Sequence, residues 1–123
     1  MIINHVSVGV RDLNTAMSFY DALFASLNIK RSHTIDNVAA CYGEQFEFWI
    51  GCPCSDKATS GNGSHIAFNA PSKASVDEFY RIAMQHGATC NGKPGLRAEY
   101  AEGYYAAYII DLDGNKLEAV TQL

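Results

Sequence analysis

Histidine and glutamate residues lie in four short apolar stretches of this chain, HVSVGV, HIAFNA, FEFWIG and NKLEAV. The residues are His5, His65, Glu47 and Glu118. Neutral imidazole and carboxylate are ligands that zinc, iron, manganese, nickel and cobalt ions share. Two imidazoles and one carboxylate leave coordination positions open for a substrate, so these residue types predict an open, catalytic kind of metal site.

Each of these residues also has a structural interpretation. A strand histidine is usually satisfied by a hydrogen bond, and Glu118 could lie at a solvated sheet edge opposite a lysine or arginine. In FEFWIG, Glu47 alternates with Phe46 and Phe48, so it shares a strand face with Trp49. If the phenylalanines pack under helices, Glu47 and Trp49 face a cleft. The alternative places Glu47 on the surface of an edge strand.

The two halves of the chain repeat the same order of features. A shift of 60 residues superimposes HVSVGV on HIAFNA and the Phe-Tyr pair at 19–20 on the pair at 79–80. A shift of 71 residues superimposes Glu47 on Glu118. Such self-similarity is typical of an internal repeat. A pseudo-twofold axis would bring equivalent residues together, so the two histidines and one or both glutamates would meet in a shared cleft.

Hydrophobic periodicity gives each half one strand, one helix and three further strands. The helices follow Asp12 and a cap at Ser72 or Ser75. The expected strands lie at 2–10, 29–35, 37–43, 46–51, 64–70, 88–92, 103–111 and 115–120. We therefore predict an α+β fold in a single domain, 1–123, with two tandem βαβββ modules that form a shared, barrel-like cleft. Module one covers 1–50, a glycine-rich and serine-rich linker covers 51–63, and module two covers 64–123.

The composition restricts the partners of the protein. The chain has 123 residues and a formal net charge of -4, and its few basic residues are scattered. Nucleic acid is therefore not an expected partner, because phosphate binding requires a basic face. No apolar run is long enough to span a bilayer and the N-terminus does not resemble a signal peptide, so we expect a cytoplasmic protein without a membrane partner. The four cysteines follow no disulfide or zinc-ribbon spacing.

Three further residues are candidates for contact with a substrate. Trp49 would supply an apolar wall of the cleft. Arg97 lies in the segment KPGLRAEYAEGYY, which we expect to cover the cleft, and could neutralise an acidic substrate; a lone loop arginine also occurs as a plain surface residue. Neighbouring strand residues point to opposite faces, so only one of Tyr104 and Tyr105 can face the substrate. We predict that it is Tyr105.

The segments HVSVGVRDL…SFY, GSHIAF and YYAAYIIDLDGNKLEAV resemble the vicinal oxygen chelate superfamily, which includes glyoxalase I, bleomycin-resistance proteins and extradiol dioxygenases. The resemblance covers nearly the whole chain, and its most specific part is the turn and strand from Asp111 to Glu118. The usual DPDG of this turn is DLDG here. The resemblance implies two βαβββ modules around one divalent ion, with His5, His65 and Glu118 as metal ligands. It places a fourth family position, which also serves in proton transfer, near Glu47.

These observations predict a metal-dependent enzyme of lyase or isomerase type, with a zinc, nickel, iron, manganese or cobalt ion. A small substrate with two neighbouring oxygens would chelate the ion, and Glu47 would act as general base. The first alternative is a metal-free protein that binds or sequesters a small molecule, as in the bleomycin-resistance group, and a second is a dioxygenase. The resemblance also implies a homodimer, in which the cleft is built within one chain or from modules of two chains.

Overall fold

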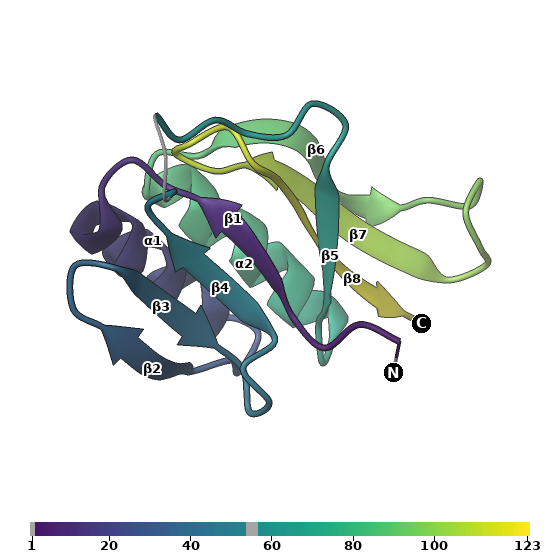
Figure 1. Cartoon of the computed structure of the whole chain (residues 1–123). Coiled ribbons are helices and arrows are strands. Elements are labelled where there is room, and N and C mark those ends of the chain that lie inside the picture. Colours follow the sequence, from purple (N-terminus) through teal and green to yellow (C-terminus); the bar gives the residue numbers. More distant parts are fainter. Residues whose placement is uncertain (1, 54–56) are drawn as a thin grey trace.

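Two helices and eight strands make up the computed structural model, which describes residues 2–53 and 57–123 (Figure 1). The first module contains β1 (Val6–Gly9), α1 (Leu13–Ala25), β2 (Arg31–Ile35), β3 (Ala39–Tyr42) and β4 (Phe48–Gly51). The second module contains β5 (His65–Asn69), α2 (Lys73–Gln85), β6 (Thr89–Leu96), β7 (Tyr104–Ile110) and β8 (Lys116–Gln122). None of the helices in these ranges is long and apolar enough to cross a membrane.

The strands form two separate four-stranded sheets with the same topology, β1-β4-β3-β2 and β5-β8-β7-β6. In each sheet the first strand pairs in parallel with the last, and the remaining pairs are antiparallel. The predicted α+β fold with two tandem βαβββ modules is therefore confirmed. The two sheets do not close into a barrel, because no ladder of the described residues joins them.

The helices confirm the repeat, since α2 begins and ends 60 residues after α1. Ser72 is the N-cap of α2, and its side chain accepts a hydrogen bond from the Ser75 backbone N–H. Asp12 occupies the same place before α1, but its carboxylate accepts from the Thr15 hydroxyl at 2.7 Å instead of from the backbone. The strand expected from residue 2 begins only at Val6, where pairing with β4 begins.

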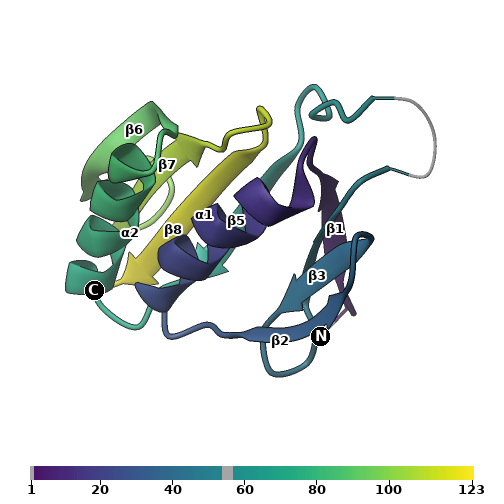
Figure 2. The same ribbon diagram turned by 90° about the vertical axis from the view of Figure 1, so that its left-hand side faces the viewer.

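One hydrophobic core serves both modules. Figure 2 shows α1 between α2 and the sheet of the first module, with α2 beside β6 and β7 of the second. Phe68 of β5 packs its ring against Phe24 of α1 at 4.9 Å and against Phe48 of β4 at 5.1 Å between ring centroids. These edge-to-face contacts join the first module to the second. The modules therefore pack as one domain, although their sheets are separate.

A buried polar contact also joins the modules, where the DLDGN turn of the second meets the first. The Asp111 carboxylate is 5% exposed and accepts hydrogen bonds from the Tyr20 hydroxyl of α1 and from the backbone N–H groups of Asp113 and Asn115. The Asn115 side chain donates to the Gly9 carbonyl oxygen at 3.2 Å. Burial and the Asp111 carboxylate raise the pKa of Tyr20 well above its ordinary value, so its hydroxyl remains a donor.

Candidate functional site

The second module brings His65 and Glu118 into direct contact. His65 Nε2 lies 2.7 Å from Glu118 Oε1. Parallel pairing places His65 opposite Lys116 and Ala67 opposite Glu118, so both side chains project from the sheet face that the helices do not cover. The Glu118 side chain is only 3% exposed, whereas the His65 side chain is 35% exposed. A buried carboxylate is thus paired with an imidazole that solvent and ligands can reach.

Two tyrosines of β7 surround this pair. The Tyr104 hydroxyl donates to Glu118 Oε2 at 2.5 Å. Tyr108 lies directly opposite Glu118 in the ladder, and its ring centroid is 5.9 Å from that of His65. Burial and the charge of Glu118 raise the pKa of Tyr108. Its hydroxyl is buried and has no hydrogen-bond partner among the described residues.

Tyrosine titration tests the contact between Tyr104 and Glu118. Burial, the hydrogen bond and the charge of Glu118 raise the pKa of Tyr104 from 10.0 to about 12. The folded state thus favours the neutral phenol, so its contribution to stability is complete below pH 10 and is lost as the pH rises towards 12. We expect the ultraviolet absorbance of Tyr104→Phe to lack one late-titrating phenol, and Glu118→Gln to move that titration to lower pH. If the phenol lost in Tyr104→Phe titrates near pH 10 and Glu118→Gln titrates as the wild type does, this hydrogen bond does not form.

The first module places a different set of groups around its histidine. His5 is exposed, and its Nδ1 lies 2.7 Å from the Asn4 side-chain oxygen. Its ring meets the Trp49 ring edge-on, with 6.4 Å between centroids. The Trp49 Nε1–H donates to the Phe46 carbonyl oxygen at 2.9 Å. His5 thus contacts an indole, whereas His65 contacts a carboxylate.

Strand register shows which residues of the two modules are equivalent. Ser7 pairs with Trp49 in the first module, and Ala67 pairs with Glu118 in the second. Because Ser7 and Ala67 are related by the repeat, Trp49 is the structural counterpart of Glu118. The match of Glu47 with Glu118, expected from the sequence, is therefore wrong by two residues. Trp49 occupies the position at which a fourth ligand was expected.

Backbone hydrogen bonds at the ends of the parallel ladders give the same register. The Val10 N–H donates to the Gly51 carbonyl oxygen at 3.0 Å, and the Ala70 N–H donates to the Val120 carbonyl oxygen at 2.8 Å. Gly51 and Val120 are 69 residues apart in the chain, whereas the turn glycines match at 71. The first module therefore has two more residues than the second between its turn glycine and the end of the strand that pairs in parallel. An alignment on the turn glycines consequently shifts these strands by two residues.

Glu47 belongs to that longer turn. It precedes β4, and its Oε1 accepts a hydrogen bond from the Gln45 backbone N–H at 2.7 Å. Gly43 has a φ of 103° and leaves room for this carboxylate, because a Cβ there would lie 2.3 Å from Glu47 Oε1. Phe46 adopts a φ of 58°, which is uncommon for a non-glycine residue. The Glu47 carboxylate therefore stabilises a strained turn in this conformation, beside the strand that follows His5.

The structure reverses the predicted orientation of the two neighbouring tyrosines. Tyr105 points to the helix side, where its hydroxyl donates to Asp77 of α2 at 2.5 Å. Tyr104 is the neighbour that contacts Glu118. Alternation along the strand was correctly expected, but hydrophobicity does not distinguish two adjacent tyrosines, so Tyr105 was placed on the wrong face. Tyr108 and Lys116, which the sequence analysis did not select, share the face of Glu118.

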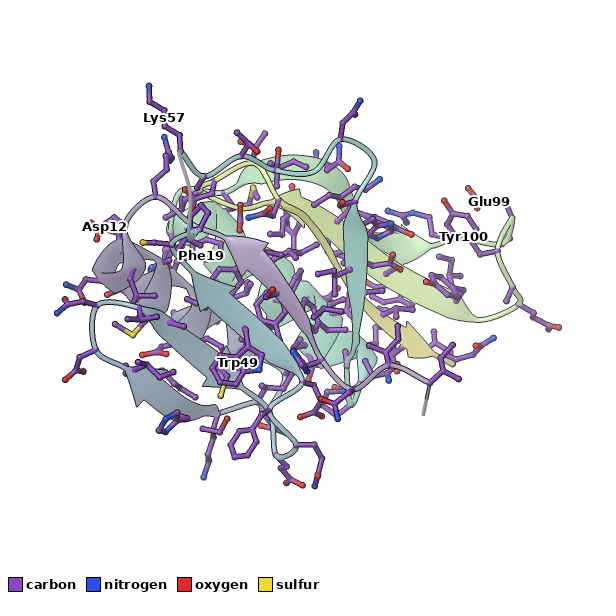
Figure 3. All side chains as sticks on the ribbon, in the orientation of Figure 1. Asp12, Phe19, Trp49, Lys57, Glu99 and Tyr100 are labelled. Atoms are coloured by element: carbon purple, nitrogen blue, oxygen red, sulfur yellow. The ribbon has the colours of Figure 1, made fainter. Side chains whose placement is uncertain are left out.

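Arg97 lies beside this face, and it follows a strand instead of lying in the long loop that was expected. Strand β6 continues to Leu96, and the Arg97 guanidinium carbon lies 5.2 Å from the Tyr108 ring centroid. Figure 3 shows Tyr100 on the hairpin that joins β6 and β7, and Trp49 on the sheet of the first module. The groups around His65 thus lie in a different part of the molecule from the groups around His5.

The donor set fits one half of a metal site. His65 and Glu118 provide an imidazole nitrogen and a carboxylate oxygen on one face, and the Tyr104 hydroxyl orients the carboxylate. Within 2–53 and 57–123, no three histidine, cysteine, aspartate or glutamate side chains lie close enough to hold an ion together. In this structure His5 therefore does not form such a group with His65 and Glu118.

Comparison with known proteins extends these observations. The model of the Glyoxalase/Bleomycin resistance protein/Dioxygenase superfamily matches residues 2–119. A glyoxalase/bleomycin resistance protein from Albidiferax ferrireducens T118 is 35% identical, with 98% of each chain covered and a TM-score of 0.87.

Two more distant structures share the fold. A glyoxalase/bleomycin resistance protein/dioxygenase family enzyme from Burkholderia phytofirmans PsJN is 17% identical, with 98% of each chain covered and a TM-score of 0.74. The hypothetical protein SA1046 from S. aureus is 16% identical, with 98% of this chain and 94% of that chain covered and a TM-score of 0.73. No curated protein matches the chain.

Proposed function

The chain belongs to the Glyoxalase/Bleomycin resistance protein/Dioxygenase superfamily, and we propose that it is a metal-dependent enzyme of lyase or isomerase type that acts on a small molecule. Its ligands would be His5, His65 and Glu118, an open set of two imidazoles and one carboxylate. The observation that carries this proposal is the contact of His65 with the buried carboxylate of Glu118 at 2.7 Å.

The burial of Glu118 favours a ligand role over a structural one. An ionised carboxylate removed from water is unfavourable unless charged or hydrogen-bonding partners compensate. Glu118 has two partners, the imidazole of His65 and the hydroxyl of Tyr104. Both partners lie on the sheet face that the helices do not cover, where a ligand could replace them. The pair is therefore arranged so that a cation could take the place of the direct contact between imidazole and carboxylate.

The remaining residues would have separate roles. A divalent ion, once bound, would polarise a substrate through two neighbouring oxygens. Tyr104 would hold Glu118 in orientation through its hydrogen bond. Trp49 would provide an apolar wall next to His5. Glu47 would serve as general base after release from the Gln45 N–H, since in this conformation its carboxylate is bound within its own turn.

We further propose that the site is completed in a homodimer, with His5 from one chain and His65 and Glu118 from another. His65 begins β5, whereas His5 directly precedes β1 of the other sheet, and both of these strands lie at a sheet edge. Ile2 and Ile3, which lead to His5, are 102% and 59% exposed. Exposed apolar residues next to an incomplete site favour burial against a second copy of the chain.

Metal analysis tests the ligand set. Protein purified without chelating resin is expected to hold one divalent ion per chain. We expect His5→Ala, His65→Ala and Glu118→Gln each to lose it, with affinity reduced by about two orders of magnitude or more, because each removes a ligand. His86→Ala, which changes an exposed histidine at the end of α2, is the matched control and should retain the ion. Wild-type protein without metal would contradict the proposal.

Mixing two inactive variants tests where the ligands come from. One chain would carry His5→Ala, and the other would carry His65→Ala with Glu118→Gln. If the site is shared between chains, each mixed dimer contains one intact ligand set, and metal binding returns on mixing. If each chain builds its own site, mixing restores nothing, and the exchanged arrangement is excluded.

One observation favours the alternative of a metal-free binding protein. Glu118 is already satisfied by His65 and Tyr104 without an ion, and tyrosine rings surround it. A carboxylate among aromatic rings suits a cationic, planar ligand. Absence of metal from the wild type, together with saturable binding of such a ligand, would favour this second function.

A further inference from the structure

We propose that the substrate of the His65 and Glu118 site carries an anionic group, a carboxylate or a phosphate, which binds between Arg97 and Lys116 over the Tyr108 ring. The inference rests on the proposed function, because it names the substrate class of the same site. Three observations support it: the fixed position of Arg97, the position of Lys116, and the unpartnered hydroxyl of Tyr108.

Arg97 is held in place by the backbone of β6. Its Nη2 donates to the Lys93 carbonyl oxygen at 2.6 Å, and its guanidinium lies over the Tyr108 ring. Two glycines make room for it. A Cβ at Gly92 would lie 2.8 Å from Tyr108 Cδ1 and 3.3 Å from Arg97 Nη2, and a Cβ at Gly95 would lie 2.9 Å from Arg97 Nη1. The segment NGKPG thus leaves space in which the guanidinium packs. A surface arginine that moves freely would not need such space.

Lys116 approaches the same ring. Its Nζ lies 5.7 Å from the Tyr108 ring centroid, and the residue is half-buried. In the ladder Lys116 pairs with His65, so the ammonium lies near the imidazole. Both residues line a pocket of about 300 Å³, whose other walls are polar or glycine residues. The remaining lining residues are Ser60, Gly61, Asn62, Gly63, Ser64 and Gly114.

Among the described residues, no acidic side chain forms an ion pair with Arg97 or Lys116. A cation–π contact is weaker than a charge-assisted hydrogen bond to an anion, so a carboxylate or phosphate between the two side chains would bind them more strongly than the ring does.

Tyr108 adds a donor that this conformation does not use. Its hydroxyl is buried without a hydrogen-bond partner among the described residues, which is uncommon for a native structure. The residue is 7% exposed and lies beneath the two cations. An anion bound between Arg97 and Lys116 over the ring could also accept from this hydroxyl. Because Tyr108 lies opposite Glu118 in the ladder, the rest of the substrate would then reach the candidate metal ligands.

The test is an NMR titration of the full-length protein with malonate and, separately, with inorganic phosphate. It is performed on the protein as purified and again after metal removal at low ionic strength. We expect saturable shifts at residues of β7, β8 and 60–64 in the metal-free wild type, with at least one of the two anions. Arg97→Gln and Lys116→Gln should each weaken this binding by roughly tenfold. Arg97→Lys should retain part of it, and Arg81→Gln on α2 should bind as the wild type does.

The preferred anion identifies the group that the substrate carries. Absence of saturable binding for both anions, or equal affinity in wild type, Arg97→Gln and Lys116→Gln, would overturn the inference. Metal analysis of the same samples separates it from the proposed function, since neither substitution removes a ligand. A wild type with stoichiometric metal but no anion binding contradicts only the substrate class. Anion binding that depends on Arg97 in a protein without metal contradicts only the metal-dependent chemistry.

Discussion

Replacing Asp111 with alanine is expected to lower the free energy of unfolding by about 3–5 kcal/mol, because several buried donors lose their acceptor together. Asp111 accepts from the Tyr20 hydroxyl, from the backbone N–H groups of Asp113 and Asn115, and from the Asn115 side chain. The carboxylate is the point at which the DLDGN turn contacts α1. Urea unfolding followed by circular dichroism measures the change.

Two variants make this result specific. Tyr20→Phe removes only one of the donors to Asp111 and should cause a smaller loss, about 1–2 kcal/mol. Glu99→Ala changes an exposed residue of the turn after β6 and should stay within about 0.5 kcal/mol of the wild type (Figure 3). If Asp111→Ala were as stable as Glu99→Ala, the turn would not connect the modules as the structure indicates.

Phe24→Ala is expected to lower the free energy of unfolding by about 3–5 kcal/mol. The Phe24 side chain is fully buried, and its ring packs against Tyr42, Phe48 and Phe68 at 5.1, 5.4 and 4.9 Å between centroids. Its removal leaves a cavity where α1 packs against strands of both modules. The loss of stability should therefore affect the whole domain. Val38→Ala, at a residue that is 54% exposed, is the control and should have little effect.

The same experiment shows whether the modules unfold together. Trp49 is the only tryptophan of the chain and reports on the first module by fluorescence, whereas circular dichroism reports on both. We expect one transition with the same midpoint for the two probes, shifted to lower urea in Phe24→Ala. Separate midpoints in the wild type would show that the shared core does not make one cooperative unit.

The repeat and the α+β fold were predictable from local sequence, and so was the choice of His65 and Glu118 as candidate site residues. A strand followed by an amphipathic helix is encoded by spacing alone, so α1 and α2 could be recognised at a shift of 60 residues. Glu118 could be selected because a carboxylate between apolar strand neighbours must have a partner. The prediction that only one of Tyr104 and Tyr105 faces the site also followed from strand geometry.

Only the tertiary structure decided which of these residues meet. Turn glycines matched at a shift of 71, but hydrogen bonding between β1 and β4 sets a register of 69, which places Trp49 opposite Ser7 and moves Glu47 into the turn. Strand register depends on pairing between segments that are distant in the chain. The two additional residues of the turn give no local sequence signal of the change in register. In the same way, sequence could not show that His65 contacts Glu118 while His5, before β1 of the other sheet, contacts Trp49 instead. Local spacing determines which elements form, and packing between them determines which side chains share a site.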